Sequence, residues 1–426
     1  MAANPNTMTF KQVFSAEYQM SHFKQPVYQV LADTRFEAGL SKGQTLNRSY
    51  ASDVVVNDMG GDGSYSTQAI TDTQESLTIN KEKEASIYVK KLDELQAHLP
   101  VKQKYGRKLA NALINQIDGD VLLAAYQGAG STVDDGSISG GTAGNGVAVT
   151  ANNVAQLFTI AYEKLIKKNV VYNANARFSG MNVEVPDGMP IAVVPAEVLT
   201  FIQLYLGGKD TMLGDRVSTN GFRGSFMGFE LFVSNALPWT GELGIATQPT
   251  DGDTVTINGV TFTFKTVLGS TPGNVLIGAS ADTANTNLAA LINTPGTTTS
   301  EGVALSAANQ KLLKNITATA NTTPNTLTIV ASGWGVVEVS ETLTAAADVW
   351  TVGKEIVHGI FGLSKSVTLV VQKDPSLEEN FVSGKIGRDY IAWTVYGLKV
   401  FVDQAPQLGD FAFLSTTYSA SANTPK

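Results

Sequence analysis

The chain has 426 residues, 43% hydrophobic and 16% charged, so it can form two or three domains with substantial cores. Its 38 acidic and 30 basic residues give a net charge of −8, which argues against an electrostatic nucleic-acid binder. It has no cysteine, which excludes disulfides and thiolate metal sites.

The first residues lack the basic and apolar regions of a secretory signal. No apolar run approaches the roughly 18 residues that would span a bilayer. We therefore expect a protein of the reducing cytoplasm with no membrane partner.

Residues 1–44 are weakly periodic, and Phe10 and Phe14 fall on one helical stripe with Val13 and Tyr18. An isolated arm of this kind has little core of its own. We expect Phe10 and Phe14 to contact a surface outside the arm.

Residues 45–96 show a β pattern. We predict strands at 54–56, at 77–79 and at 85–89, where apolar and polar residues alternate. A two-stranded ribbon is marginal in water, so it needs a partner surface.

A charged run lies between the last two of these strands. Its residues are Lys81, Glu82, Lys83 and Glu84. It is either a solvated strand end or a strip of ion pairs between subunits, where an exposed pair contributes about 0–1 kcal/mol.

Val101–Gln127 is predicted to be one amphipathic helix after Pro100. Apolar side chains recur every four residues from Tyr105 to Val121, and the helix would be about 40 Å long. Residues 131–149, rich in Gly, Ser and Asp, are predicted to form a flexible linker. Asn152 or Asn153 would cap the next helix.

Beyond the linker, residues 191–194 are predicted to be a buried strand, and Pro195 opens another helix. The composition becomes rich in Thr, Ala and Asn between about 242 and 352, which predicts a small inserted α+β domain. Asn258-Gly259 is the preferred turn of a hairpin in that segment, and Asp282 would cap a helix. Strands are expected again at 367–371 and 391–396.

No catalytic, cofactor or metal site is predicted. The glycine-rich stretches 140–146 and 206–211 lack the spacing of a phosphate-binding loop. His22, His98 and His358 form no metal-ligand pattern, and each is interpreted as a surface or packing residue. No Gly-x-Ser-x-Gly sequence occurs.

The order of these features resembles the major capsid proteins of tailed bacteriophages with the HK97-like fold. Residues 43–46 and 88–96 resemble the two ends of the family's E-loop, and Val101–Gln127 resembles its spine helix. Residues 223–238, ending in Ser-Asn-Ala-Leu-Pro, and Tyr396-Gly397 resemble later strands.

The resemblance implies an α+β capsid fold, from whose minimal form the inserted β-rich α+β domain at 242–352 departs. The implied segments are an N-terminal arm at 1–44, an E-loop at 45–98, a spine helix and linker of the P-domain at 99–150, a first A-domain and P-domain part at 151–241, the inserted domain at 242–352, and closing strands with a tail at 353–426.

The resemblance also implies function. Such subunits form hexamers and pentamers of an icosahedral shell around double-stranded DNA, without sequence-specific binding. The arm and the charged run would then contact neighbouring copies, and scaffolding, portal and decoration proteins are further possible partners. Some members crosslink an E-loop lysine to an asparagine. Lys81 or Lys83 would fit, but no matching asparagine or glutamate is found, so no crosslink is predicted.

Two alternatives stay open. Another self-assembling virion part, such as a tail tube protein, fits less well because of the long helix and the Ser-Asn-Ala-Leu-Pro stretch. A surface adhesin is suggested by the Thr-rich segment, although an export signal is missing.

Overall fold

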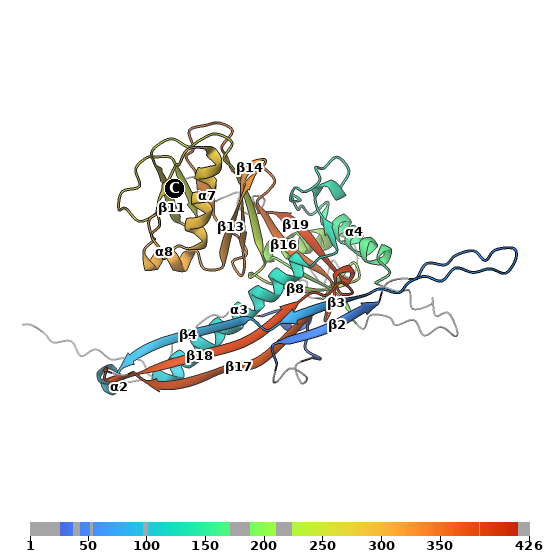
Figure 1. The fold of residues 1–426 in the computed structure, drawn as a ribbon, viewed down its shortest axis with the longest axis horizontal. Helices are drawn as coiled ribbons and strands as arrows, with labels where there is room; N and C mark the ends of the chain where they lie inside the picture. Colours follow the sequence, from blue (N-terminus) through green and yellow to red (C-terminus); the bar gives the residue numbers. More distant parts are fainter. Residues whose placement is uncertain are drawn as a thin grey trace, which may run out of the picture.

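The computed structural model describes residues 26–36, 43–51, 54–96, 101–170, 188–209, 224–382 and 384–415. An elongated four-stranded sheet and a nine-stranded central sheet organise the chain, and the long helix α3 (Val101–Gln127) runs from one to the other (Figure 1). No helix in the described part of the chain is long and apolar enough to cross a membrane.

The elongated sheet has the order β1-β17-β18-β4. Its strands are β1 (Ala32–Asp33), β4 (Lys81–Lys90), β17 (Val367–Phe381) and β18 (Gly387–Lys399). Leu109 and Leu113 of α3 are buried against Tyr390 and Ala392 of β18, so the period of four predicted the packed face correctly. The short helices α1 (Tyr28–Leu31) and α2 (Lys91–Gln96) lie at either end of this unit.

A two-stranded ribbon leaves this unit. It consists of β2 (Thr45–Ala51) and β3 (Asp72–Thr78), which pair antiparallel. The strand predicted at 54–56 is wrong, because the described residues of the connecting loop, 54–71, form no strand. The loop projects far from the body of the molecule, and none of the described strands lies beside it there (Figure 1).

The central sheet has the order β13-β14-β9-β16-β6-β8-β7, with β19 and β5 continuing from β16. Its bounds are β5 (Ser131–Val133), β6 (Pro190–Val194), β7 (Ser225–Phe226), β8 (Phe229–Val233), β9 (Trp239–Gly244), β13 (Ile316–Thr322), β14 (Asn325–Ala331), β16 (Ile356–Leu363) and β19 (Leu408–Leu414). All eight residues of β16 are buried, as its apolar sequence requires at the centre of a sheet.

Two helices pack beside the central sheet. They are α4 (Val154–Lys167) and α5 (Ala196–Gly207), and their buried side chains share a cluster with Phe229 and Phe361. Asn153 precedes α4, but its side chain accepts a hydrogen bond from Thr150 N at 2.8 Å and makes no cap to the helix. The predicted cap is therefore wrong in detail.

The flexible linker predicted at 131–149 is also wrong. β5 pairs in parallel with β19, and Val147 and Val149 are buried. The Asp134 carboxylate accepts hydrogen bonds from Gly144 N and Ser137 Oγ, which folds the intervening residues into a compact loop. The glycines serve tight turns here and not mobility.

Segment 242–352 begins and ends at adjacent points. Gly244 N donates to Val349 O at 3.0 Å, and Thr351 N donates to Glu242 O at 2.8 Å. Between them lies a four-stranded sheet of β10 (Thr254–Ile257), β11 (Val260–Lys265), β12 (Asn274–Leu276) and β15 (Val339–Glu341), with helices α7 (Ala281–Asn293) and α8 (Ala307–Leu312). Asn258 and Gly259 have φ angles of 50° and 77°, so the predicted hairpin turn is confirmed.

The cap of α7 is Ser280, whose Oγ accepts from Thr283 N at 3.2 Å, and not Asp282. The structure differs more from the prediction of a separate inserted domain. β14 pairs with β9 from Thr326 to Ala331, so the β13–β14 hairpin extends the central sheet. The buried core is continuous from α3 into this segment, which is consequently joined to the sheet along a whole strand.

Candidate assembly surfaces

The tip of the ribbon, residues 54–70, carries unpartnered apolar surface. Its large apolar side chains are between 66% and 94% exposed; they are Val54, Val55, Val56, Met59, Tyr65 and Ile70. A monomeric protein rarely keeps so many apolar side chains together in water. They are typical of a surface that another molecule covers.

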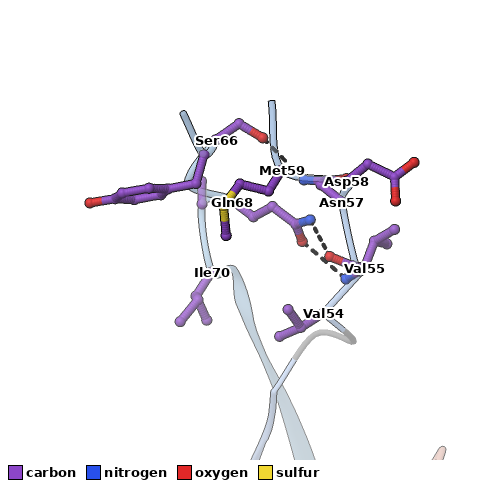
Figure 2. A pocket seen from close by; sticks show the side chains of 10 residues that line it. Val54, Val55, Asn57, Asp58, Met59, Ser66, Gln68 and Ile70 are labelled. Carbon is purple, nitrogen blue, oxygen red and sulfur yellow. Dashed lines mark hydrogen bonds between the residues drawn. The ribbon is translucent and has the colours of Figure 1, made fainter. Parts of the chain in front are cut away.

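Side chains, not strand pairing, hold the two arms of the tip together. Gln68 accepts from Val55 N at 3.0 Å and donates to Val55 O, and Asn57 Nδ2 donates to Ser66 Oγ at 3.1 Å (Figure 2). The arms line a cavity of about 310 Å³. The tip therefore has a defined conformation, although it has no hydrophobic core.

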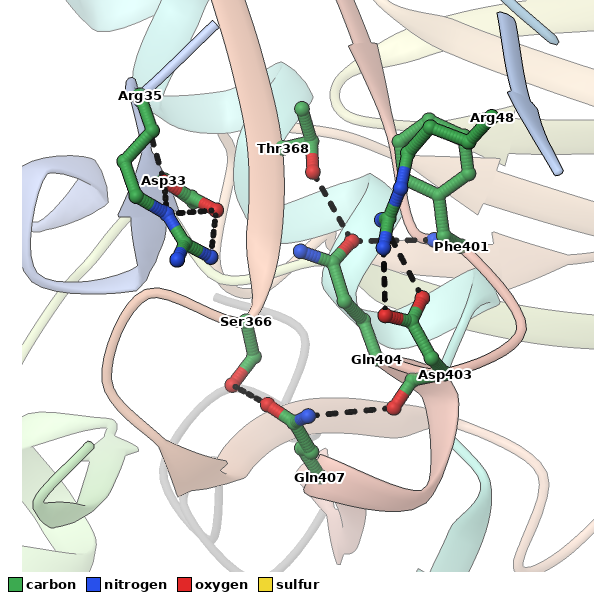
Figure 3. Close-up of polar contacts among 9 residues, drawn as sticks. All are labelled: Asp33, Arg35, Arg48, Ser366, Thr368, Phe401, Asp403, Gln404 and Gln407. Atoms are coloured by element: carbon green, nitrogen blue, oxygen red, sulfur yellow. Dashed lines mark hydrogen bonds and ion pairs between the residues drawn. The ribbon is translucent and has the colours of Figure 1, made fainter. Parts of the chain in front are cut away.

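The base of the ribbon is fixed to its own chain. Leu77 and Ile79 are buried with Val370 and Phe401 in a small cluster. Arg48 forms an ion pair with Asp403 at 2.8 Å, and its guanidinium lies 4.5 Å from the centre of the Phe401 ring (Figure 3).

The turn beneath Arg48 is itself tightly bonded. Gln404 Oε1 accepts from Thr368 Oγ1 and from Phe401 N, both at 3.1 Å, and Ser366 Oγ donates to Gln407 Oε1 at 3.5 Å (Figure 3). The ribbon thus has an anchored base and a free tip.

The charged run lies inside β4, where it pairs with β18 and not with the ribbon. Lys81 Nζ lies 3.0 Å from Asp120 Oδ2 of the same chain. Glu82 and Glu84 are exposed, and Lys83 is half-buried. A contact between subunits through this run stays a prediction, and the two exposed glutamates are its best candidates. Phe10 and Phe14 lie outside the described residues.

Asp120 joins several elements. Its Oδ2 also accepts from Tyr396 Oη at 2.6 Å, and its Oδ1 accepts from Gln116 Nε2 at 3.1 Å. Gln116 Oε1 in turn accepts from Asn315 Nδ2 at 2.9 Å. Burial and the nearby Asp120 carboxylate raise the pKa of Tyr396 well above its usual value. Sequence analysis did not identify this network, because its members are far apart in the chain.

The far end of the elongated sheet is a second apolar surface. Leu92, Leu95, Phe381 and Ile386 are between 62% and 84% exposed there. The two apolar surfaces lie at opposite ends of the long axis of the molecule (Figure 1). Such an arrangement suits contacts that run head to tail between copies.

Within the described ranges, no three His, Asp or Glu side chains are grouped to hold a metal ion. His358 is buried against Asp410, so it is a packing residue and not a surface residue. His22 and His98 lie outside the described residues.

No protein-family model matches the sequence. No curated protein matches it either. Solved structures do match. A chain from the structure of Mycobacterium phage Che8 has a TM-score of 0.55 and 15% identity, over 96% of this chain and 98% of that one. A chain from the capsid structure of the cyanophage P-SCSP1u has a TM-score of 0.51 and 12% identity, over 96% of each chain.

The chain therefore has the fold of a bacteriophage capsid protein, nearly end to end. At these identities the likeness establishes the fold.

Proposed function

We propose that this chain is the major capsid protein of a tailed bacteriophage with the HK97-like fold. In this proposal it self-assembles into hexamers and pentamers of an icosahedral shell that encloses double-stranded DNA. Its role is structural and not enzymatic. The observation that carries the proposal is the exposed apolar tip on an anchored ribbon, in a chain whose fold matches phage capsid chains along its length.

The ribbon would be the E-loop, shortened to about residues 45–79 because β4 belongs to the elongated sheet. The elongated sheet with α3 would be the P-domain, and the central sheet with α4 and α5 the A-domain. Segment 242–352 would be an insertion carried by the A-domain. We expect no crosslink, as the sequence predicted.

Physical chemistry favours self-association through the tip. Burying an apolar side chain of this size contributes about 1.5–3 kcal/mol. Six of them would contribute on the order of 10 kcal/mol before the entropic cost of association. A contact between the tip of one copy and a different surface of the next is heterologous, and such contacts form a ring when the rotation from copy to copy closes.

The net charge of −8 suits a wall that encloses DNA without binding it tightly. Scaffolding, portal and decoration proteins stay predicted partners. Assembly in the host cytoplasm also stays a prediction.

Electron microscopy of the expressed protein tests the proposal. We expect hollow isometric particles from the unmodified chain. Replacing Val55, Val56 and Ile70 together by Ser should abolish them and leave folded, smaller species. Val267→Ser is a matched control, because Val267 is equally apolar and 80% exposed but lies in segment 242–352.

Three outcomes are informative. Particles from the control but not from the tip variant support the proposal. Hollow tubes of stacked rings would favour the tail tube alternative. A monomeric unmodified chain at high concentration would refute self-assembly through these surfaces.

A further inference from the structure

A cavity of about 290 Å³ lies against one face of the central sheet, away from both apolar surfaces. Strands β14, β9, β16 and β19 contribute to it, together with the end of α3 and the loop after β5. Its lining includes Tyr126, Asp134, Thr240, Glu242, His358 and Asp410. The proposed assembly uses none of these groups.

His358 lies on β16 and contacts β19, β9 and α3 at this cavity. Its Nδ1 lies 3.0 Å from both carboxylate oxygens of Asp410 on β19, and its Nε2 lies 2.8 Å from Thr240 Oγ1 on β9. The ring of Tyr126, near the end of α3, has its centre 3.8 Å from that of the imidazole. His358 and Asp410 are only 4% and 3% exposed.

The hydrogen bonds of the imidazole depend on its protonation. An ionised carboxylate only accepts, so Nδ1–H donates to Asp410, and in a neutral ring Nε2 accepts from the Thr240 hydroxyl. If the ring gains a proton, Nε2–H donates instead. The Thr240 hydroxyl must then accept, and its own proton turns toward another acceptor.

Burial and the surrounding charges act on the pKa of the Asp410 carboxyl. Burial raises the pKa of Asp410, the His358 ring opposes that shift, and the nearby Asp134 charge adds to it. Burial opposes ionisation of Asp134 too, but hydrogen bonds from Gly144 and Ser137 hold its pKa below the usual value. The pair therefore faces a negative charge across the cavity.

The other ionisable groups around the cavity are Glu242 on β9, Lys354 before β16, and Tyr126. Lys354 Nζ donates to Gly144 O at 2.8 Å. Burial and the Asp410 charge raise the pKa of Tyr126 to about 12, so this phenol stays neutral around physiological pH.

We propose that the His358–Asp410 pair is a proton-binding junction that makes the packing of α3 and β9 on the central sheet depend on pH. Histidine is the side chain whose charge changes in the physiological range. Here that change reverses a hydrogen bond to β9 and alters the charge stacked against α3. The junction lies within one subunit, so the proposal does not depend on shell assembly.

Nuclear magnetic resonance of a single imidazole tests this directly. The sequence has three histidines, and replacing His22 and His98 by Gln leaves His358 alone. We expect its ring resonances to move as the pH is varied. Amide protection in residues 121–127 and 239–244, corrected for the chemical exchange rate, should change with the same midpoint.

Two variants in that background separate the junction from general destabilisation. His358→Gln should abolish the pH dependence of protection in both segments. Thr240→Val keeps the imidazole and removes one hydroxyl, so it should move the midpoint. Resonances that do not move, protection that does not follow them, or a Thr240→Val midpoint that matches the parent would each overturn the proposal.

Discussion

The anchored base of the ribbon predicts a local, not a global, response to Leu77→Ala. Leu77 is 1% exposed in a cluster whose other buried members are Ile79, Val370 and Phe401. Deleting a buried Leu side chain to Ala costs about 2–5 kcal/mol, counting lost transfer energy and the cavity left behind. This cluster is small and separate from the main core, so its loss should release the ribbon alone.

The size of the effect follows from that cost. About 3 kcal/mol raises the open population of the ribbon by on the order of 100-fold. Hydrogen exchange measures it: amides of β3 should exchange about 100-fold faster, while amides in the middle of α3 keep their protection. Leu46→Ala is the control, because Leu46 is only partly buried against the same cluster. Equal loss of protection in β3 and α3, or no loss in β3, would refute the local anchor.

Three further predictions concern the helix, its network and segment 242–352. A Cβ on Gly119 would lie 3.2 Å from the Gly333 backbone, whereas one on Gly106 would meet only the end of Leu377 at 3.2 Å. Gly106→Ala should therefore raise the free energy of unfolding by up to about 1 kcal/mol through helix propensity. In denaturant unfolding, the Gly119→Ala variant should be about 1–2 kcal/mol less stable than the Gly106→Ala variant, and equal stabilities would contradict this. The raised pKa of Tyr396 stabilises the fold below the ordinary tyrosine value of 10.0, and that stability is lost as pH rises toward its folded-state pKa. As pH rises above about 10, the Tyr396→Phe variant should thus lose less stability than the parent. Parallel plots of unfolding free energy against pH for the two proteins would count against this. Replacing residues 245–348 by a short linker should leave a soluble core, because Gly244 and Val349 are hydrogen-bonded; wholly insoluble protein would show that β9 needs β14.

Local patterns predicted the elements whose formation depends on nearby residues. The four-residue period of Val101–Gln127 and the Asn258-Gly259 turn each determine one element by themselves. Partners distant in sequence could not be predicted this way. β4 pairs with β18, and β5 with β19, across most of the chain, and no short pattern records such pairing.

The same limit applies to the candidate surfaces. Residues 54–56 were recognised as apolar, yet only the position of the projecting loop shows that they are exposed. Three consecutive valines with no polar alternation fit a buried strand as well as an exposed loop, so this pattern does not distinguish the two. Asp120 gave no signal at all, since its partners Lys81 and Tyr396 come from opposite parts of the sequence.

The pairing of early strands with late ones has a consequence for synthesis on the ribosome. β1 pairs with β17, β4 with β18, and β5 with β19, so neither large sheet can close until residues 367–414 have been synthesised. Segment 242–352, whose hairpins and helices are local, can fold earlier. Synthesis of these late strands would thus time the moment at which the chain acquires surfaces able to recognise another copy.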